Sequence, residues 1–275
     1  MFTFIDSHEN LDFLNKELLS KTYIGVDTEF RRTTKDNMKL ALLQINDDEE
    51  IFLIDTILIE EPAEQVSFLF SDSIVKIFHS CKEDLEAVYS WTDRKIENIF
   101  DTQLANSFLD SEFSISYQAL VEKKLGIVLD KRETRSNWIR RPLSDAQLKY
   151  AALDVEYLIP IYLEQCLELS KSEKLNWLKQ DINMLVKNTF NQSSTLDVLK
   201  RVISKSEEDN ILSLMNKRFL KIAQSVEINP TMFFSKKAQK EFLRLALSEG
   251  VNKACEEITE WRELLVREEL MDILK

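Results

Sequence analysis

The sequence predicts an α/β protein with a mixed sheet flanked by helices, followed by a small all-helical C-terminal domain. Short apolar runs alternate with helical patterns through residues 1–100, which is typical of a sheet covered on both faces. After Phe100 the apolar spacing becomes mainly helical. Only 3 glycines and 4 prolines occur in 275 residues, which favours helices over a turn-rich sandwich or propeller.

The chain opens with the apolar run Phe2–Ile5, a candidate strand. Ser7 is a candidate N-cap for a first helix. The predicted apolar stripe of this helix is Leu11, Phe13, Leu14, Leu18 and Leu19. Four further runs are candidate strands, with the acidic segment NDDEE as the turn between the second and the third: Thr22–Phe30, Lys39–Ile45, Ile51–Ile54 and Ile74–Phe78.

The later elements are predicted as helices. Ser144 and Gln147 fit a capping box that opens a helix running to about Ser170, kinked or ended by Pro160. The polar segment Lys187–Thr195 loses periodicity and is predicted as a linker. These boundaries predict domains at 1–187 and 196–275, the second formed by helices such as 242–247 and 261–274.

Composition and charge exclude several classes of protein. The net charge of −12 argues against a generic nucleic-acid binder. No apolar run approaches the roughly 18 residues of a membrane span, and the start MFTFIDSHEN lacks the pattern of a secretory signal. Three widely spaced cysteines indicate no disulfide framework and fit a reducing cytoplasm. Residues 1–110 hold 10 basic and 23 acidic residues, whereas residues 111–150 hold 8 and 5.

Acidic residues mark three places where chemistry is plausible. Asp27 and Glu29 end an apolar strand and point to the same face, as oxygen ligands for Mg²⁺ or Mn²⁺ would. Asp84 follows the run Ile74–Phe78 near a helix start, where an acid also simply favours the helix dipole. Tyr150 and Asp154 share one helix face, a spacing equally compatible with core packing and a surface acid.

Taken together, these motifs resemble the DEDD exonuclease superfamily in its Tyr-type branch. Asp27-Thr-Glu29, Asp84 after His79-Ser-Cys, and Tyr150-x-x-x-Asp154 occur in the family's order. The strings YIGVDTEF, FDTQLA and LDKRETRSNWIRRPLSDAQLKYAALDVEYLIPIY resemble ribonuclease D, over roughly residues 1–170. Lys149 and the absence of a histidine near Asp154 separate the chain from the His-type branch.

The resemblance implies a ribonuclease H-like sheet and a two-metal nuclease. Asp27, Glu29, Asp84 and Asp154 are then the ligands of two divalent cations, Mg²⁺ or Mn²⁺. Tyr150 orients the attacking water, since a phenol with a pKa near 10 is a poor base at neutral pH. The implied reaction is hydrolysis from the 3′ end, which releases nucleoside 5′-monophosphates.

The implied partner is the single-stranded 3′ end of RNA, with tRNA precursors or other structured RNAs as the substrate class. The protein is expected to be a cytoplasmic monomer whose C-terminal helices resemble a nucleic-acid-binding domain. Trp138 and His79 have alternative structural interpretations, as a cap on the core and as a satisfied histidine. Candidate RNA contacts are Lys131, Arg132, Arg135, Trp138, Arg140, Arg141 and His79.

Two alternative functions remain open. A DNA 3′–5′ exonuclease uses related motifs, and no residue here identifies a reader of the 2′-hydroxyl. A catalytically silent RNA-binding protein is a more remote alternative, because Tyr150 and all four acids are present.

Overall fold

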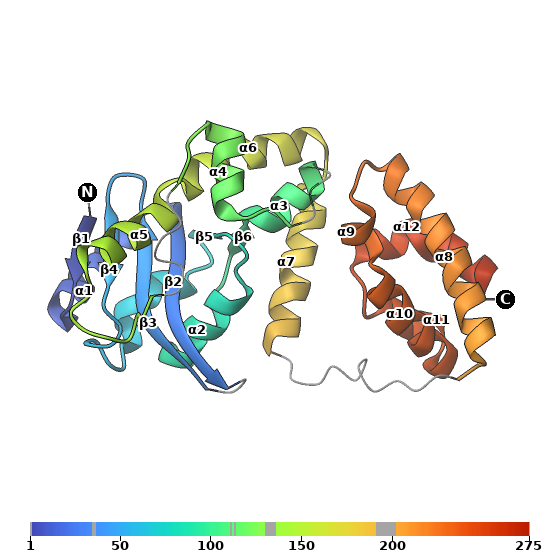
Figure 1. Ribbon diagram of the computed structural model, residues 1–275, viewed down its shortest axis with the longest axis horizontal. Helices are drawn as coiled ribbons and strands as arrows, with labels where there is room; N and C mark the ends of the chain where they lie inside the picture. Colours follow the sequence, from blue (N-terminus) through green and yellow to red (C-terminus); the bar gives the residue numbers. More distant parts are fainter. Residues whose placement is uncertain are drawn as a thin grey trace. The chain divides into compact units, whose positions relative to one another are not determined.

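The structure is a computed structural model of the chain. It describes residues 2–34, 37–110, 112, 114–129, 136–190 and 202–274. The fold divides into two compact units, Met1–Gln103 with Ile115–Leu167, and Leu104–Ser114 with Glu168–Lys275. Figure 1 shows the helices and strands of both units.

The first unit is built on a six-stranded mixed sheet in the order β1-β4-β3-β2-β5-β6, as the predicted fold class requires. β1 pairs parallel with β4, β3 is antiparallel to both of its neighbours, and β2, β5 and β6 run parallel. β2 and β3 lie at the centre, with Val26, Leu42 and Leu43 wholly buried. The strands are β1 (Phe2–Ile5), β2 (Tyr23–Thr34), β3 (Asn37–Asn46), β4 (Ile51–Ile54), β5 (Val75–Phe78) and β6 (Ile99–Asp101).

Helices cover both faces of this sheet. Alternation along β2 directs Gly25 towards α5 and directs Thr28 towards α2, so the two helices lie on opposite faces. The other elements connect the strands or close the unit's edges. The unit's helical elements are α1 (His8–Leu18), η1 (Ala63–Phe70), α2 (Lys82–Thr92), α4 (Tyr117–Leu125) and α5 (Asp145–Glu156), while α3 (Thr102–Leu109) and α6 (Leu158–Lys171) extend into the second unit.

Two sequence expectations about helices are corrected. Ser7 caps α1 as predicted, but Phe13 is 73% exposed while Leu11 and Leu14 are buried, because Phe13 points away from the stripe that faces the sheet. The helix from Ser144 breaks at Tyr157 and not at Pro160. Pro160 lies in the first turn of α6, where its missing N–H costs nothing.

The second unit is helical, and a buried ion pair joins α7 to α12 within it. Asp181 of α7 accepts hydrogen bonds from the Arg262 guanidinium, including Nη2 at 2.7 Å, and from the Trp261 indole at 2.9 Å. The segment at Lys187 predicted as linker is helical up to Phe190, and residues 191–201 lie outside the described residues. The domain boundaries 1–187 and 196–275 stay a prediction. The helices are α7 (Leu175–Phe190), α8 (Lys205–Ser225), α9 (Pro230–Phe234), α10 (Lys236–Glu249), α11 (Val251–Cys255) and α12 (Glu260–Ile273).

Among the described residues, no helix combines the length and the apolar character that a membrane crossing requires.

Candidate active site

The site begins on the central strand β2, where Asp27 and Glu29 alternate with buried residues and share one face. Asp27 stands opposite Gln44 of β3, and Glu29 stands opposite Leu42. The register shifts between Glu29 and Phe30, as at a β-bulge. Such irregularities re-aim side chains beside active sites, so the two carboxylates end the regular part of the strand.

The end of α5 brings Asp154 to the same face. Ser144 and Gln147 form the predicted capping box and fix the start of this helix. At its other end, the Asn46 side-chain amide donates to the carbonyl oxygens of Val155 at 3.0 Å and Glu156 at 3.2 Å. These contacts tie the last turn of α5 to β3.

Gly25 allows this close approach. A Cβ at Gly25 would lie 3.3 Å from Leu158 Cβ and 3.4 Å from the carbonyl oxygen of Val155. Each of Asp27, Glu29 and Asp154 offers a carboxylate oxygen, and these oxygens lie within 4.8 Å of one another. We refer to these three residues as the acidic cluster.

Asp84 lies beside the acidic cluster but does not join that close group of oxygens. It is buried in the first turn of α2, and the Thr28 hydroxyl donates to its Oδ1 at 2.5 Å. Burial raises the pKa of Asp84 to about 7, and the hydrogen bond from Thr28 opposes this rise. The charge of Asp84 in turn raises the pKa of Asp27, which places the two carboxylates in one electrostatic environment. The structure therefore brings the four predicted acids to one locality, three of them in close contact.

The acidic cluster holds its protons tightly without a cation. Burial, followed by repulsion from Asp84 and Asp154, raises the pKa of Asp27 well above its ordinary value. Burial likewise raises the pKa of Glu29 to about 9 and the pKa of Asp154 to about 7. Crowded carboxylates of this kind are the ligands that hard divalent cations prefer.

Gln44 adds a second indication that the site suits a hydrated ion. Its side chain is wholly buried opposite Asp27, and neither its Nε2 nor its Oε1 has a hydrogen-bond partner among the described residues. A buried amide without partners is costly, and an ordered water beside it would remove that cost. The donor set therefore fits a divalent metal.

Tyr150 lies one helical turn before Asp154, and its hydroxyl donates a hydrogen bond to the Asp154 carboxylate. This hydrogen bond lowers the pKa of Asp154, whereas burial raises it. Its ring centroid is 6.1 Å from that of Trp138. The phenol is thus tied to one member of the acidic cluster, and the ring of Trp138 in the loop before α5 lies near it.

His79 is a structural residue. Its Nε2 lies 3.0 Å from the carbonyl oxygen of Ile115, and its Nδ1 lies 2.9 Å from the Thr102 hydroxyl. Burial lowers the pKa of His79, so the ring is neutral, and Nε2 carries the proton because a carbonyl only accepts. Both ring nitrogens serve the fold, which favours the structural alternative over a contact with RNA.

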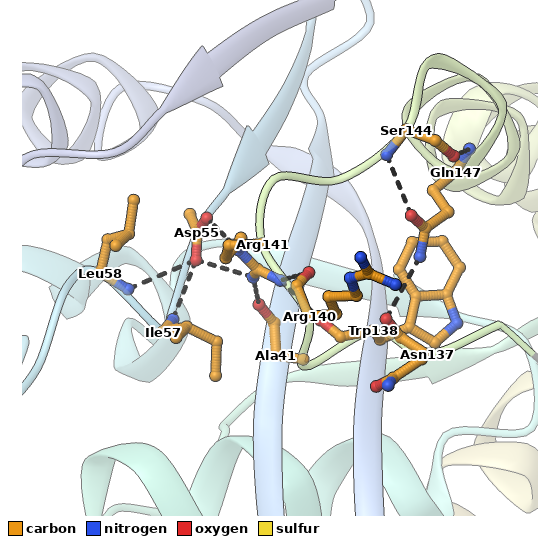
Figure 2. Close-up of polar contacts among 10 residues, drawn as sticks. All are labelled: Ala41, Asp55, Ile57, Leu58, Asn137, Trp138, Arg140, Arg141, Ser144 and Gln147. Atoms are coloured by element: carbon orange, nitrogen blue, oxygen red, sulfur yellow. Dashed lines mark hydrogen bonds and ion pairs between the residues drawn. The ribbon is translucent and has the colours of Figure 1, made fainter.

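Arg141 also serves the fold. Its guanidinium forms a bidentate ion pair with the buried carboxylate of Asp55, with Nε at 2.5 Å from Oδ2 and Nη2 at 2.7 Å from Oδ1 (Figure 2). The remaining donors reach the carbonyl oxygens of Ala41, Trp138 and Arg140. All five N–H groups are therefore used, and none is left for a phosphate.

The other predicted RNA contacts differ in their surroundings. Arg140 is exposed, and no hydrogen bond or ion pair of its guanidinium is found in the part of the chain that the structure describes, which is compatible with the prediction. Trp138 is 4% exposed, so it caps the core and offers at most an edge. Lys131, Arg132 and Arg135 lie outside the described residues, and their role stays a prediction.

Sequence reasoning missed Thr28, Asp55 and Asn46, which position the site through hydrogen bonds. The position of Thr28 could have been predicted, because it lies between Asp27 and Glu29 in a strand and its side chain must therefore point to the other face of the sheet, where α2 lies. The partners of Asp55 and Asn46 lie 86 and 109 positions away, a separation that no local pattern encodes.

Comparison with known proteins places this site in a family context. The model of the 3′–5′ exonuclease family matches residues 2–169, which include all four acids and Tyr150. The chain is 36% identical over 181 residues to ribonuclease D of Shewanella sp. strain ANA-3, covering 66% of this chain and 47% of that protein. It is 40% identical over 163 residues to ribonuclease D of Xanthomonas oryzae pv. oryzae, covering 59% and 45%. The chain thus spans about half the length of these curated relatives.

Solved structures share the fold. Escherichia coli RNase D, described as an exoribonuclease involved in structured RNA processing, superposes with a TM-score of 0.67 at 23% identity, covering 99% of this chain and 74% of that one. The catalytic core of RRP6 from Trypanosoma brucei gives 0.62 at 20% identity, covering 100% and 78%. Brucella melitensis NrnC bound to pGG gives 0.59 at 20% identity, covering 74% and 100%.

Proposed function

The chain belongs to the 3′–5′ exonuclease family, and from that premise we propose that it is a metal-dependent 3′–5′ exoribonuclease that releases nucleoside 5′-monophosphates. The observation that carries the proposal is the acidic cluster, together with the hydrogen bond from the Tyr150 hydroxyl to Asp154. The relatives named ribonuclease D support RNA as the polymer.

The four acids are the residues that would hold two divalent cations, Mg²⁺ or Mn²⁺. Asp27, Glu29 and Asp154 offer oxygens from one compact group, and Asp84 lies beside them, where the Thr28 hydroxyl holds one of its two carboxylate oxygens. Bound cations would acidify a water molecule and neutralise charge on the scissile phosphate. Tyr150 would direct that water by its hydroxyl, while Asp154 fixes the orientation of the phenol.

The substrate class that we propose is the single-stranded 3′ end of tRNA precursors or other structured RNAs. Arg140 is an exposed cation close to the site in sequence and is suited to a backbone phosphate. We further propose that the protein is a monomer and that it is cytoplasmic, since its three cysteines form no disulfide and would stay reduced in that compartment.

The test is the degradation of one 3′-hydroxyl oligomer, made as RNA and as DNA, in Mg²⁺, Mn²⁺ or EDTA. We expect stepwise shortening of RNA that stops in EDTA and in Asp154→Asn, which should still bind RNA. Tyr150→Phe should slow hydrolysis without changing the Mg²⁺ concentration needed for half-maximal rate. Equal shortening of DNA would favour the DNA exonuclease alternative, and binding without shortening would favour a silent RNA-binding protein.

A further inference from the structure

A pocket of about 310 Å³ borders the strand that carries the acidic cluster. β2 contributes Phe30 and Arg31, which directly follow Glu29, and the loop before α5 contributes the other lining residues. This volume is at the lower end of the range for small-molecule sites, about 300–1,000 Å³, and suits a single nucleotide. The pocket is lined by Phe30, Arg31, Ser136, Asn137 and Trp138.

Arg31, the cation that lines this pocket, has a second cation beside it on the neighbouring strand. Arg31 stands directly opposite Lys39 in the antiparallel β2–β3 pair, and both side chains are exposed. No ion pair or hydrogen bond to either side chain is found within the described ranges. Like charges at directly opposite positions destabilise a sheet, and an anion bound between them reverses that effect. The neighbouring Arg32 differs, because Glu86 accepts a hydrogen bond from it.

The opposite wall of the pocket offers an aromatic ring system and unsatisfied donors. Trp138 is buried, yet its Nε1–H has no hydrogen-bond partner among the described residues. The exposed side chain of Asn137 lies next to it in the same wall. A carbonyl oxygen on an entering base supplies the acceptor that the buried indole lacks.

Hydrogen bonds from two side chains hold the backbone of this wall in place. The Trp138 carbonyl accepts from Arg141 at 2.6 Å, and the Asn137 carbonyl accepts from Gln147 at 3.4 Å (Figure 2). Arg141 is itself held by its ion pair with Asp55, the residue that directly follows β4. A preformed wall loses little freedom when a ligand binds.

We propose that this pocket is a nucleotide subsite for single-stranded RNA, in which Arg31 and Lys39 bind a backbone phosphate while Trp138 and Asn137 contact the base. The proposal rests on the proposed function, because it concerns a nucleotide neighbouring the one that is released. Arg31 is two residues beyond Glu29, about 7 Å along an extended strand, which is roughly the span of one nucleotide. A nucleotide matches both walls, because its phosphate is an anion for Arg31 and Lys39 and its base is a ring for Trp138 and Asn137.

The test compares RNA binding in Mg²⁺ by full-length variants built in the Asp154→Asn background, so that turnover does not obscure the measurement. We expect Arg31→Gln and Lys39→Gln each to raise the Kd about fivefold to tenfold and to reduce the slope of log Kd against log salt by about 0.7. The matched control is Lys16→Gln, an exposed cation on α1. It should leave both quantities unchanged.

A second arm locates the base. A single abasic nucleotide is moved stepwise from the 3′ end of the oligomer, and we expect the affinity to fall most at one position near that end. Asn137→Ala and Trp138→Phe should reduce that positional penalty, while other positions respond as in the parent protein. Circular dichroism confirms that each variant is folded.

Two results would overturn the proposal. One is that Arg31→Gln and Lys39→Gln bind RNA with the same Kd and salt slope as Lys16→Gln. The other is an abasic penalty that Asn137→Ala and Trp138→Phe leave intact. Failure of the proposed function is distinguishable, because it would appear as an absence of RNA shortening by the protein with native Asp154, whatever the binding measurements show.

Discussion

Replacing Arg141 by Gln should destabilise the sheet-bearing unit by about 3–5 kcal/mol, the usual cost of removing one partner from a buried ion pair. Arg141→Gln removes both charge-assisted bonds to Asp55, each worth about 1.5–3 kcal/mol. The Asp55 side chain is only 1% exposed, so water cannot replace the lost donors. Among the described residues, the donors that remain to this carboxylate are the backbone N–H groups of Ile57 and Leu58, at 3.0 and 3.3 Å.

Urea denaturation followed by circular dichroism measures this loss. With a slope of about 1–3 kcal/mol/M, the midpoint should fall by at least about 1 M. Arg140→Gln is the control at the adjacent position, and because its side chain is exposed we expect a change within about 0.5 kcal/mol. Arg141→Met combined with Asp55→Leu should recover much of the stability, since no buried charge then remains unpaired.

The opposite pattern would refute this reasoning. If Arg141→Gln changed the unfolding free energy by less than about 0.5 kcal/mol and instead lowered RNA affinity and its salt dependence, the guanidinium would be a phosphate ligand. The ion pair with Asp55 would then have no structural role in solution.

Three further outcomes follow from the geometry. Gly25→Ala should lower the single-turnover rate about tenfold, because its Cβ pushes the end of α5 and Asp154 away; an unchanged rate would contradict the close approach. Asp181→Ala should cost about 2–4 kcal/mol in the helical unit, because the Arg262 charge loses its carboxylate and the Trp261 indole loses its acceptor; calorimetry would detect a lower transition temperature, and an unaltered transition would count against the pair. In EDTA, the melting temperature should fall as pH rises from about 5 to 9, because the pKa of Glu29 is raised to about 9 and the folded protein therefore binds this proton more tightly than the unfolded chain. Mg²⁺ should therefore stabilise the protein most at high pH. A melting temperature that does not change with pH would exclude this linkage.

Which acidic side chains share a face was predictable from the sequence, whereas the contacts that hold them in place were not. Asp27 and Glu29 stand at alternate positions of a strand, and Tyr150 and Asp154 stand one helical turn apart, so local periodicity indicates which side chains share a face. The capping box at Ser144 was likewise a local signal and is confirmed.

Charge in the sequence was a poorer guide. Arg140 and Arg141 are adjacent and equally basic, yet Arg140 is exposed, while the donors of Arg141 are taken up by Asp55, which follows β4, and by backbone carbonyls. The exposure of Phe13 shows the same limitation, because an apolar residue near a stripe is assigned to a face only by the surface that packs against it. Contacts between distant segments decide such cases, and periodicity carries no information about them.

The docking of α5 against Gly25 and Asn46 has a consequence for the newly made chain. Asp27 is synthesised early, but its partner Asp154 follows about 130 positions later, and Asp154 joins it only after α5 is complete and seated on the strand. At about 5–20 residues per second, roughly 6 to 25 s of translation separate the two carboxylates. During that interval the polypeptide carries β2 and its acids without an assembled centre, so the acidic cluster is completed only late in biosynthesis.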